Sequence, residues 1–454
     1  MASSASLNRL ALSGVIWTIL GYGASQVMRF GGNLILTRLL LPEYFGLMAL
    51  VNIPIIGLQL FSDVGIIPSI VQNKRGDEPE FYNTAWTLQI GRGFGLWLFC
   101  LAIAYPTAQF YNEPRLLLLI PIVGLTTILN GFESTAVATL RRHVDLAKTI
   151  KFDALMQAAS LVFMIIWAWF SPTIWALVGG NLVAATLRTA RSFWLIPGYR
   201  NQLCWDQESV RELFSFGRWI FISTALTFLA TQADRLILGK YISINLLGVY
   251  TIAFTLSDIP RQIIGALGTK VIFPVVSRTA DLPRPELRAK ILKKRWLLLI
   301  GSAVLLSGVV GFGDLFILTL YDNRYKDAAW MVPVMSFGLW HTLLYSTMNP
   351  CLLSVGKSVY GAWGNLLRFG AIAFGIPFGF TAAGLWGGIL AITFSDLPMY
   401  GVVLYGLQKE RLGCGWQDVK ATAVFLGLLA VALGLRMSLG WGLPAFGGTI
   451  TTSF

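Results

Sequence analysis

Arginine side chains occur inside several long apolar segments of this 454-residue chain. Arg92 and Arg368 each lie about nine residues from the nearest segment end, or about 14 Å along a helix. A lipid-facing arginine at that depth costs about 2.5–3.5 kcal/mol or more, so it normally faces a cavity or a charged partner. The candidates for ligand binding in a cavity are Arg29, Arg92, Arg218, Arg261 and Arg368. For Arg29, Arg92 and Arg368 the alternative is a buried ion pair. Arg218, Arg261 and Arg436 are close enough to a segment end to reach the membrane interface.

Carboxylates also occur inside apolar segments. Three of them are candidates for exchanging a proton or a sodium ion: Asp63, Asp258 and Asp396. Residues 257–260 (Ser-Asp-Ile-Pro) resemble residues 395–398 (Ser-Asp-Leu-Pro), and proline interrupts a helix. Each Asp therefore either caps the helix that restarts after the break or lines a cavity as a counter-ion. We expect His341 to make a satisfied polar contact.

No pattern typical of catalysis, metal binding or a disulfide framework is present. The cysteines at positions 100, 204, 351 and 414 form no Cys-x-x-Cys pair, and the chain has only two histidines. A Walker A loop is also missing. The sequence predicts a non-enzymatic transporter without a cofactor, coupled at most to H⁺ or Na⁺.

The composition is that of a membrane protein. Hydrophobic residues make up 55% of the chain and charged residues 13%, whereas soluble proteins are about a quarter charged. The mean hydropathy is +0.66. The first apolar run is too long for a cleavable signal.

Runs of about 20 apolar residues span a bilayer. We place thirteen of them, at 13–36, 44–70, 83–106, 115–138, 151–170, 173–196, 212–234, 243–268, 291–320, 328–354, 358–377, 382–406 and 418–438. The tail 441–454 is either a loop or a shortened fourteenth helix, so we expect 12–14 helices.

The charged loops predict the orientation. With the N-terminus in the cytoplasm, the inside loops hold 23 Lys and Arg residues, Arg188 and Arg295 among them, and the outside loops hold 6. This distribution agrees with the positive-inside rule. This topology accounts for the net charge of +13. No basic stretch interleaved with aromatic residues predicts nucleic-acid binding.

An internal repeat predicts two lobes. Residues 34–36 (Leu-Ile-Leu) recur at 236–238, and residues 176–182 (ALVGGNL) resemble 384–390 (GLWGGIL). Six helices per half bring both halves into the membrane from the same side, so the repeat is parallel. We predict an all-α membrane protein with two parallel six-helix lobes around a central cleft. The predicted domains are 1–200, 201–410 and an additional helix and tail at 411–454.

Two segments carry a family resemblance. Residues 34–55 (LILTRLLLPEYFGLMALVNIPI) contain Arg38, Pro42, Phe45 and Gly46, and residues 140–155 (LRRHVDLAKTIKFDAL) form a basic stretch. They resemble bacterial polysaccharide-export flippases of the multidrug/oligosaccharidyl-lipid/polysaccharide superfamily. The likeness covers essentially the whole chain, although the incomplete fourteenth helix departs from the commonest form of the family.

The resemblance implies a flippase in the bacterial inner membrane. Such a protein moves oligosaccharides linked to undecaprenyl pyrophosphate to the periplasmic leaflet for O-antigen, capsule or exopolysaccharide synthesis. Its expected partners are the lipid-linked oligosaccharide, membrane lipids, a polysaccharide polymerase and a chain-length regulator. Arginines suit a pyrophosphate because they bind it in a bidentate manner.

Other functions remain as alternatives. A multidrug or cation antiporter of the same superfamily would favour acidic side chains in its cavity. A lipid II flippase would share both fold and substrate chemistry. A polymerase or ligase would need a large periplasmic loop, which is missing from the predicted topology.

Overall fold

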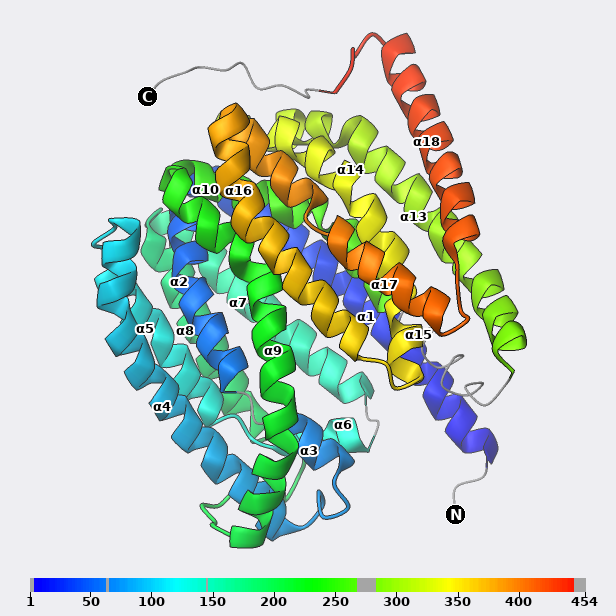
Figure 1. The fold of residues 1–454 in the computed structure, drawn as a ribbon. Helices are drawn as coiled ribbons and strands as arrows, with labels where there is room; N and C mark the ends of the chain where they lie inside the picture. The colour runs from blue at the N-terminus through cyan, green and yellow to red at the C-terminus, as the bar shows by residue number, and fades with distance from the viewer. Residues whose placement is uncertain (1–3, 63–64, 144–145, 268–282, 445–454) are drawn as a thin grey trace. The chain divides into compact units, whose positions relative to one another are not determined.

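The computed structural model describes residues 4–62, 65–143, 146–267 and 283–444, with side chains except at 4–20, 22, 146–147, 214–223, 266–267 and 354. In these ranges the chain forms helices and no β-strand (Figure 1). Its internal contacts divide it into two compact units, Met1–Ala225 (unit 1) and Leu226–Phe454 (unit 2). The division falls inside a helix, Gln207–Tyr241, so residues 201–225 belong with unit 1. The repeat and the central cleft stay predictions.

Unit 1 is built from α1 (Ser4–Leu39), α2 (Pro42–Phe61), α3 (Ile66–Gln72), α4 (Pro79–Tyr111), α5 (Leu116–Gly131), α6 (Ala136–Arg142), α7 (Leu146–Phe170), α8 (Ile174–Ser192) and the first part of α9 (Gln207–Tyr241). Helix α4 packs along α5, α1 packs along α7, and α8 contacts both α5 and α7. Two predicted spans are broken here. The 44–70 segment is divided between α2 and α3, and the 115–138 segment between α5 and α6, which are bent by 58°.

Side chains of α4 satisfy the backbone groups at these breaks. The last carbonyls of a helix have no partner within the helix. Arg92 Nη2 donates to the carbonyl oxygen of Gln59, near the end of α2, at 2.6 Å. Gln89 Nε2 donates to the carbonyl oxygens of Asn130 and Gly131, at the end of α5. Helix α4 therefore holds both interrupted helices in place.

The connection between α8 and α9 is bound to the rest of unit 1. Asn201 Nδ2 donates to Thr135 Oγ1 at 2.7 Å, and the Tyr199 hydroxyl lies 3.0 Å from the same oxygen. Burial raises the pKa of Tyr199 to about 12, so this hydroxyl stays protonated at neutral pH. Arg75, before α4, forms an ion pair with Glu212 of α9 at 3.2 Å. The start of α9 is thus fixed to the α3–α4 connection.

Unit 2 contains the second part of α9 and α10 (Ile244–Ser257), α11 (Ile259–Leu267), α13 (Arg284–Leu320), η2 (Asn323–Tyr325), α14 (Ala328–Ser346), α15 (Asn349–Ser354), α16 (Val359–Phe394), α17 (Leu397–Lys409) and α18 (Gly415–Ser438). Helix α13 packs against α14 and α18 around a core that includes Leu299, Leu343 and Phe425. The predicted third part of the chain contributes α18. Residues 445–454, where a fourteenth helix would fall, lie outside the described residues.

Helix α16 consists of two arms joined at Ala383 and Gly384. Gly384 has φ 57°, ψ −142°, a conformation that glycine adopts without a steric penalty. The arms approach so closely that a Cβ on Gly387 would lie 2.0 Å from the Gly379 carbonyl oxygen. The arms correspond to the separate segments predicted at 358–377 and 382–406, and the second is interrupted again before α17.

Six helical stretches of the described chain are long and apolar enough to cross a membrane, or seven if the bent α5–α6 pair is one span. One of the six, Val359–Lys409, includes both arms of α16. The predicted count of thirteen therefore stays a prediction. The loop assignment of Arg295 was wrong: this residue, counted among the cytoplasmic loop charges, lies fully buried within α13.

Candidate functional site

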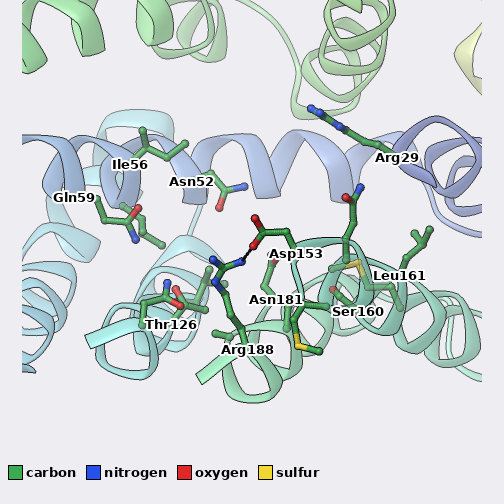
Figure 2. Close-up of a pocket in the computed structure, with 18 of the residues that line it drawn as sticks. Arg29, Asn52, Ile56, Gln59, Thr126, Asp153, Ser160, Leu161, Asn181 and Arg188 are labelled. Atoms are coloured by element: carbon green, nitrogen blue, oxygen red, sulfur yellow. Dashed lines mark hydrogen bonds and ion pairs between the residues drawn. The ribbon is translucent and has the colours of Figure 1, made fainter. Parts of the chain in front are cut away.

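A polar cavity of about 610 Å³ lies among α1, α2, α5, α7 and α8 of unit 1 (Figure 2). A second cavity, of about 620 Å³, lies among α2, α3, α4, α5, α6 and α8. It shares Ile56, Gln59, Asn130 and Arg188 with the first. The two cavities therefore adjoin. Amide and hydroxyl side chains dominate the polar lining of the first: Asn33, Asn52, Gln59, Thr126, Asn130, Gln157, Ser160 and Asn181. Such groups both donate and accept hydrogen bonds, as sugar hydroxyls require.

Arg188 of α8 lies where the cavities adjoin. Its Nε donates to Glu133, between α5 and α6, at 2.9 Å, and its Nη1 donates to Asp153 of α7 at 2.8 Å. Figure 2 shows the Arg188–Asp153 pair among the cavity-lining side chains. Arg188 was counted among the cytoplasmic loop charges, although position 188 falls inside the predicted segment 173–196. The structure places it within α8, on the walls of both cavities. The sequence did contain a signal for this pairing. Glu133 and Asp153 lie near the predicted cytoplasmic ends of segments 115–138 and 151–170, at a depth similar to that of Arg188.

Two of the predicted arginines line these cavities. Arg29 of α1 is exposed, lines the first cavity and lies apart from the Arg188–Asp153 pair (Figure 2). Among the described residues, no carboxylate forms an ion pair with Arg29. Arg92 lines the second cavity, where its Nε donates to Ser62 Oγ at 2.9 Å in addition to the Gln59 contact. Arg92 thus combines a structural role at the end of α2 with a position on the cavity wall.

Four other predicted residues meet in unit 2. Arg261 Nε lies 2.6 Å from Asp258 Oδ1, and Arg368 Nε lies 2.9 Å from Asp396 Oδ1. Thr342 Oγ1 also donates to Asp396 at 2.7 Å. All five residues surround a cavity of about 40 Å³, which has room for a water or an ion but not for a sugar. The arginines and acids selected separately from the sequence are therefore partners of one another.

The two Ser-Asp-x-Pro segments do interrupt helices, but the capping interpretation is wrong at Asp396. Asp396 precedes α17 and makes no side-chain hydrogen bond to the start of that helix. Asp258 separates α10 from α11, and its carboxylate accepts from the side chains of Arg261 and Gln262. The geometry fits the counter-ion interpretation at both positions.

Two further expectations were wrong. Arg436, expected to reach the interface, is 2% exposed, and its guanidinium forms an ion pair with the buried Asp314. A buried arginine needs an opposite charge close by, and Asp314 supplies it from a neighbouring helix. His341 is 7% exposed, and its Nε2 has no hydrogen-bond partner among the described residues, so the expected polar contact is missing at this nitrogen.

Two candidate residues have no described side chain. Asp63 lies outside the described residues, as does the side chain of Arg218, whose backbone is part of α9. The four cysteines, all within the described ranges, form no disulfide bond. No group of three or more metal-binding side chains occurs within the described part of the chain.

The helical fold and its polar cavities define the class as a multi-pass membrane transporter. The structure is similar to an inward closed conformation of the lipid II flippase MurJ, with a TM-score of 0.67 and 11% identity, covering 93% of this chain and 99% of that one. It is also similar to an inward-facing multidrug transporter of the MATE family, with a TM-score of 0.64 and 14% identity, covering 83% and 93% of the two chains. At these identities the likeness concerns the fold alone.

The family follows from the sequence comparison. The polysaccharide biosynthesis protein model matches residues 35–330, so the chain belongs to that family. Lipopolysaccharide biosynthesis protein WzxC of Escherichia coli K12 is 24% identical over 80% of this chain and 70% of its own length. Succinoglycan biosynthesis transport protein ExoT of Rhizobium meliloti is 22% identical over 79% and 73%. The family resemblance inferred from the sequence is confirmed.

Proposed function

We propose that the protein is an inner-membrane flippase for oligosaccharide repeat units linked to undecaprenyl pyrophosphate. It moves them from the cytoplasmic to the periplasmic leaflet for O-antigen, capsule or exopolysaccharide synthesis. Family membership and relatives named for lipopolysaccharide and succinoglycan biosynthesis support this proposal. The observation that carries it is the pair of adjoining polar cavities in unit 1.

The lining of these cavities matches the two chemical parts of such a head group. Sugar hydroxyls cannot leave water without new hydrogen-bond partners, and the amides of the first cavity provide them. Pyrophosphate needs cationic donors. The linings of the two cavities contain two acids, Glu133 and Asp153, and four arginines. The arginines are Arg29, Arg92, Arg141 and Arg188. Their volumes lie within the range of about 300–1,000 Å³ typical of ligand sites.

Arg188 and Arg29 play different parts in this mechanism. Arg188 is held by two carboxylates in the structure, so the pyrophosphate must compete with Glu133 and Asp153 for the guanidinium. Arg29, which lines the first cavity, has no carboxylate to give up among the described residues. Its guanidinium is a planar fork of donors that suits a phosphate group. Substrate entry therefore changes the pairing of Arg188, whereas Arg29 adds a direct contact.

The alternatives are less well supported. A cation antiporter would need a cavity with excess negative charge, and the unit 1 cavities have more arginines than acids. A lipid II flippase is supported by the fold alone.

The coupling, orientation and partners belong to the same proposal. We place the N-terminus in the cytoplasm, a polymerase and chain-length regulator beside the protein, and proton or sodium exchange at Asp63, Asp258 or Asp396. No other cofactor is required. If Asn at all three positions left transport unchanged, the proposed exchange at these acids would be wrong.

The test is surface polysaccharide in a flippase-deleted strain that carries single variants. Arg29→Ala and Arg188→Ala should each lower polymer about tenfold or more, because each removes a charge-assisted contact. Arg29→Lys and Arg188→Lys keep the charge but lose the planar fork, so they should lower it less. The matched control is Arg191→Ala, which removes an exposed arginine of α8 outside both cavity linings.

Membrane levels of each variant are measured by immunoblot. Removing Arg188 also leaves Glu133 and Asp153 without their partner, so its effect on transport has two causes. Arg29 has no ion pair among the described residues, so its variant tests the cavity contact alone. Full polymer from well-inserted Arg29→Ala and Arg188→Ala variants would overturn the cationic-cavity mechanism.

A further inference from the structure

A separate cavity of about 290 Å³ lies between the N-terminal parts of α13 and α18 in unit 2. Arg288 and Lys420 contribute its positive charge, and Leu292, Trp296 and Trp416 contribute apolar surface. None of these residues lines the cavities of the proposed transport site. We call this feature the α13–α18 pocket.

The charge of the α13–α18 pocket is not neutralised within the described chain. Arg288 and Lys420 are both exposed, and no described carboxylate forms an ion pair with either. The nearest acid along α18, Asp418, is buried and pairs with Arg295 at 2.6 Å. The pocket therefore presents two cations to a ligand.

The pocket walls are held in fixed positions. Arg288 Nε donates to the carbonyl oxygen of Gly413, just before α18, at 2.6 Å. Gln417 of α18 donates to the carbonyl oxygen of Leu292 at 2.8 Å and accepts from Arg295 at 3.0 Å. These contacts join α13 to α18 directly beside the cations, so the site is organised before any ligand arrives.

The surroundings of the pocket suit a lipid better than a soluble anion. The Lys420 ammonium lies 5.5 Å from the centre of the Trp416 ring, and Trp416 is 70% exposed. Tryptophan is enriched at the level of lipid head groups. The neighbouring residues Leu297 and Val419 are also exposed, and they offer apolar surface for acyl chains.

We propose that the α13–α18 pocket binds the head group of an anionic phospholipid of the cytoplasmic leaflet. The phosphodiester lies between Arg288 and Lys420, and the acyl chains lie along the exposed apolar surface of α13 and α18. The leaflet follows from the basic residues around the start of α13, which predict a cytoplasmic location. Basic pockets between membrane helices on that side recognise such head groups. The site is independent of the proposed sugar substrate.

The experiment measures lipid retention by native mass spectrometry on the purified full-length protein in detergent. Phosphatidylglycerol and phosphatidylcholine with identical acyl chains are added separately. We expect a preference for phosphatidylglycerol. Arg288→Ala/Lys420→Ala should weaken its binding about thirtyfold, since each basic residue contributes about fivefold near an anionic surface.

The matched control is Lys293→Ala/Lys294→Ala, which removes the same charge from exposed positions of α13 outside the pocket. It should weaken binding by less than about threefold, because exposed charges at a distance are screened. The Arg288→Lys/Lys420→Arg variant keeps both charges and should retain the preference, which separates loss of binding from loss of folding.

Three results would overturn the proposal. The first is no preference for phosphatidylglycerol in the unaltered protein. The second is an equal loss in both alanine variants, which would indicate a diffuse surface potential. The third is displacement of phosphatidylglycerol by equal concentrations of glycerol phosphate or by undecaprenyl phosphate, which would assign the pocket to a soluble anion or to the carrier lipid.

Discussion

At the scale of single residues, arginines buried in unit 2 are matched by carboxylates from other helices. Arg295 of α13 pairs with Asp418 of α18, and Arg436 of α18 pairs with Asp314 of α13. The two pairs cross-link the same two helices. Removing one partner of a buried pair leaves the other charge without water or a counter-ion, which is costly.

Arg436→Ala should therefore destabilise the protein by about 3–5 kcal/mol. The control Arg324→Ala breaks a half-exposed pair with Asp322 and should cost no more than about 1 kcal/mol. Thermal unfolding in detergent compares the two. Asp314→Leu/Arg436→Met should recover most of the lost stability, because it removes both charges. Equal melting of the two single variants would contradict a structural role for the buried pair.

At the scale of helices, interruptions place polar groups inside apolar segments. The break between α5 and α6 positions Glu133 for Arg188, and the break before α17 positions Asp396 for Arg368. The reversal within α16 has a different basis. It depends on glycines that allow two backbones to touch, which is common where membrane helices pack closely.

Gly387→Ala tests this close approach. Its new Cβ would lie 2.0 Å from the Gly379 carbonyl oxygen, so the arms of α16 must separate, at about 1–3 kcal/mol. The control is Gly370→Ala in the same helix, where a Cβ meets nothing within 4 Å. That change should be neutral or slightly stabilising, because alanine favours a helix. Unfolding temperatures that fall equally for both variants would exclude the packing explanation.

At the scale of the whole molecule, the two units use their charges differently. Unit 1 has adjoining cavities large enough for a ligand, with arginines on their walls. Unit 2 has a cavity of about 40 Å³ closed by mutual ion pairs. We infer that unit 1 provides the substrate contacts in the proposed mechanism, whereas ion coupling at Asp258 or Asp396 would take place in unit 2.

The predicted orientation can be tested with single cysteines in a variant without the four native ones. Cysteines at Glu208 and Lys290, both exposed, should react with an impermeant reagent only after the cells are opened. A cysteine at Arg324, also exposed, should react in intact cells. The physical reason is the excess of Lys and Arg in the loops assigned to the cytoplasm. Ready labelling of position 290 in intact cells would contradict the thirteen-helix topology.

The sequence by itself determined the class, the family and the presence of charged groups inside apolar helices. These features depend on local composition and short motifs, such as the apolar runs and residues 34–55. Their predictions needed no knowledge of which helices are neighbours.

Only the tertiary structure decided which charges face a cavity and which face one another. Arg368 and Arg29 look alike in the sequence, yet Arg368 is paired with Asp396 and Arg29 lines an open cavity. Arg188 was assigned to a loop, yet it lies between two cavities, and its partners are 55 and 35 residues away along the chain. The free energy of a buried charge depends on atoms within a few ångströms, and helix packing brings those atoms together from distant parts of the chain.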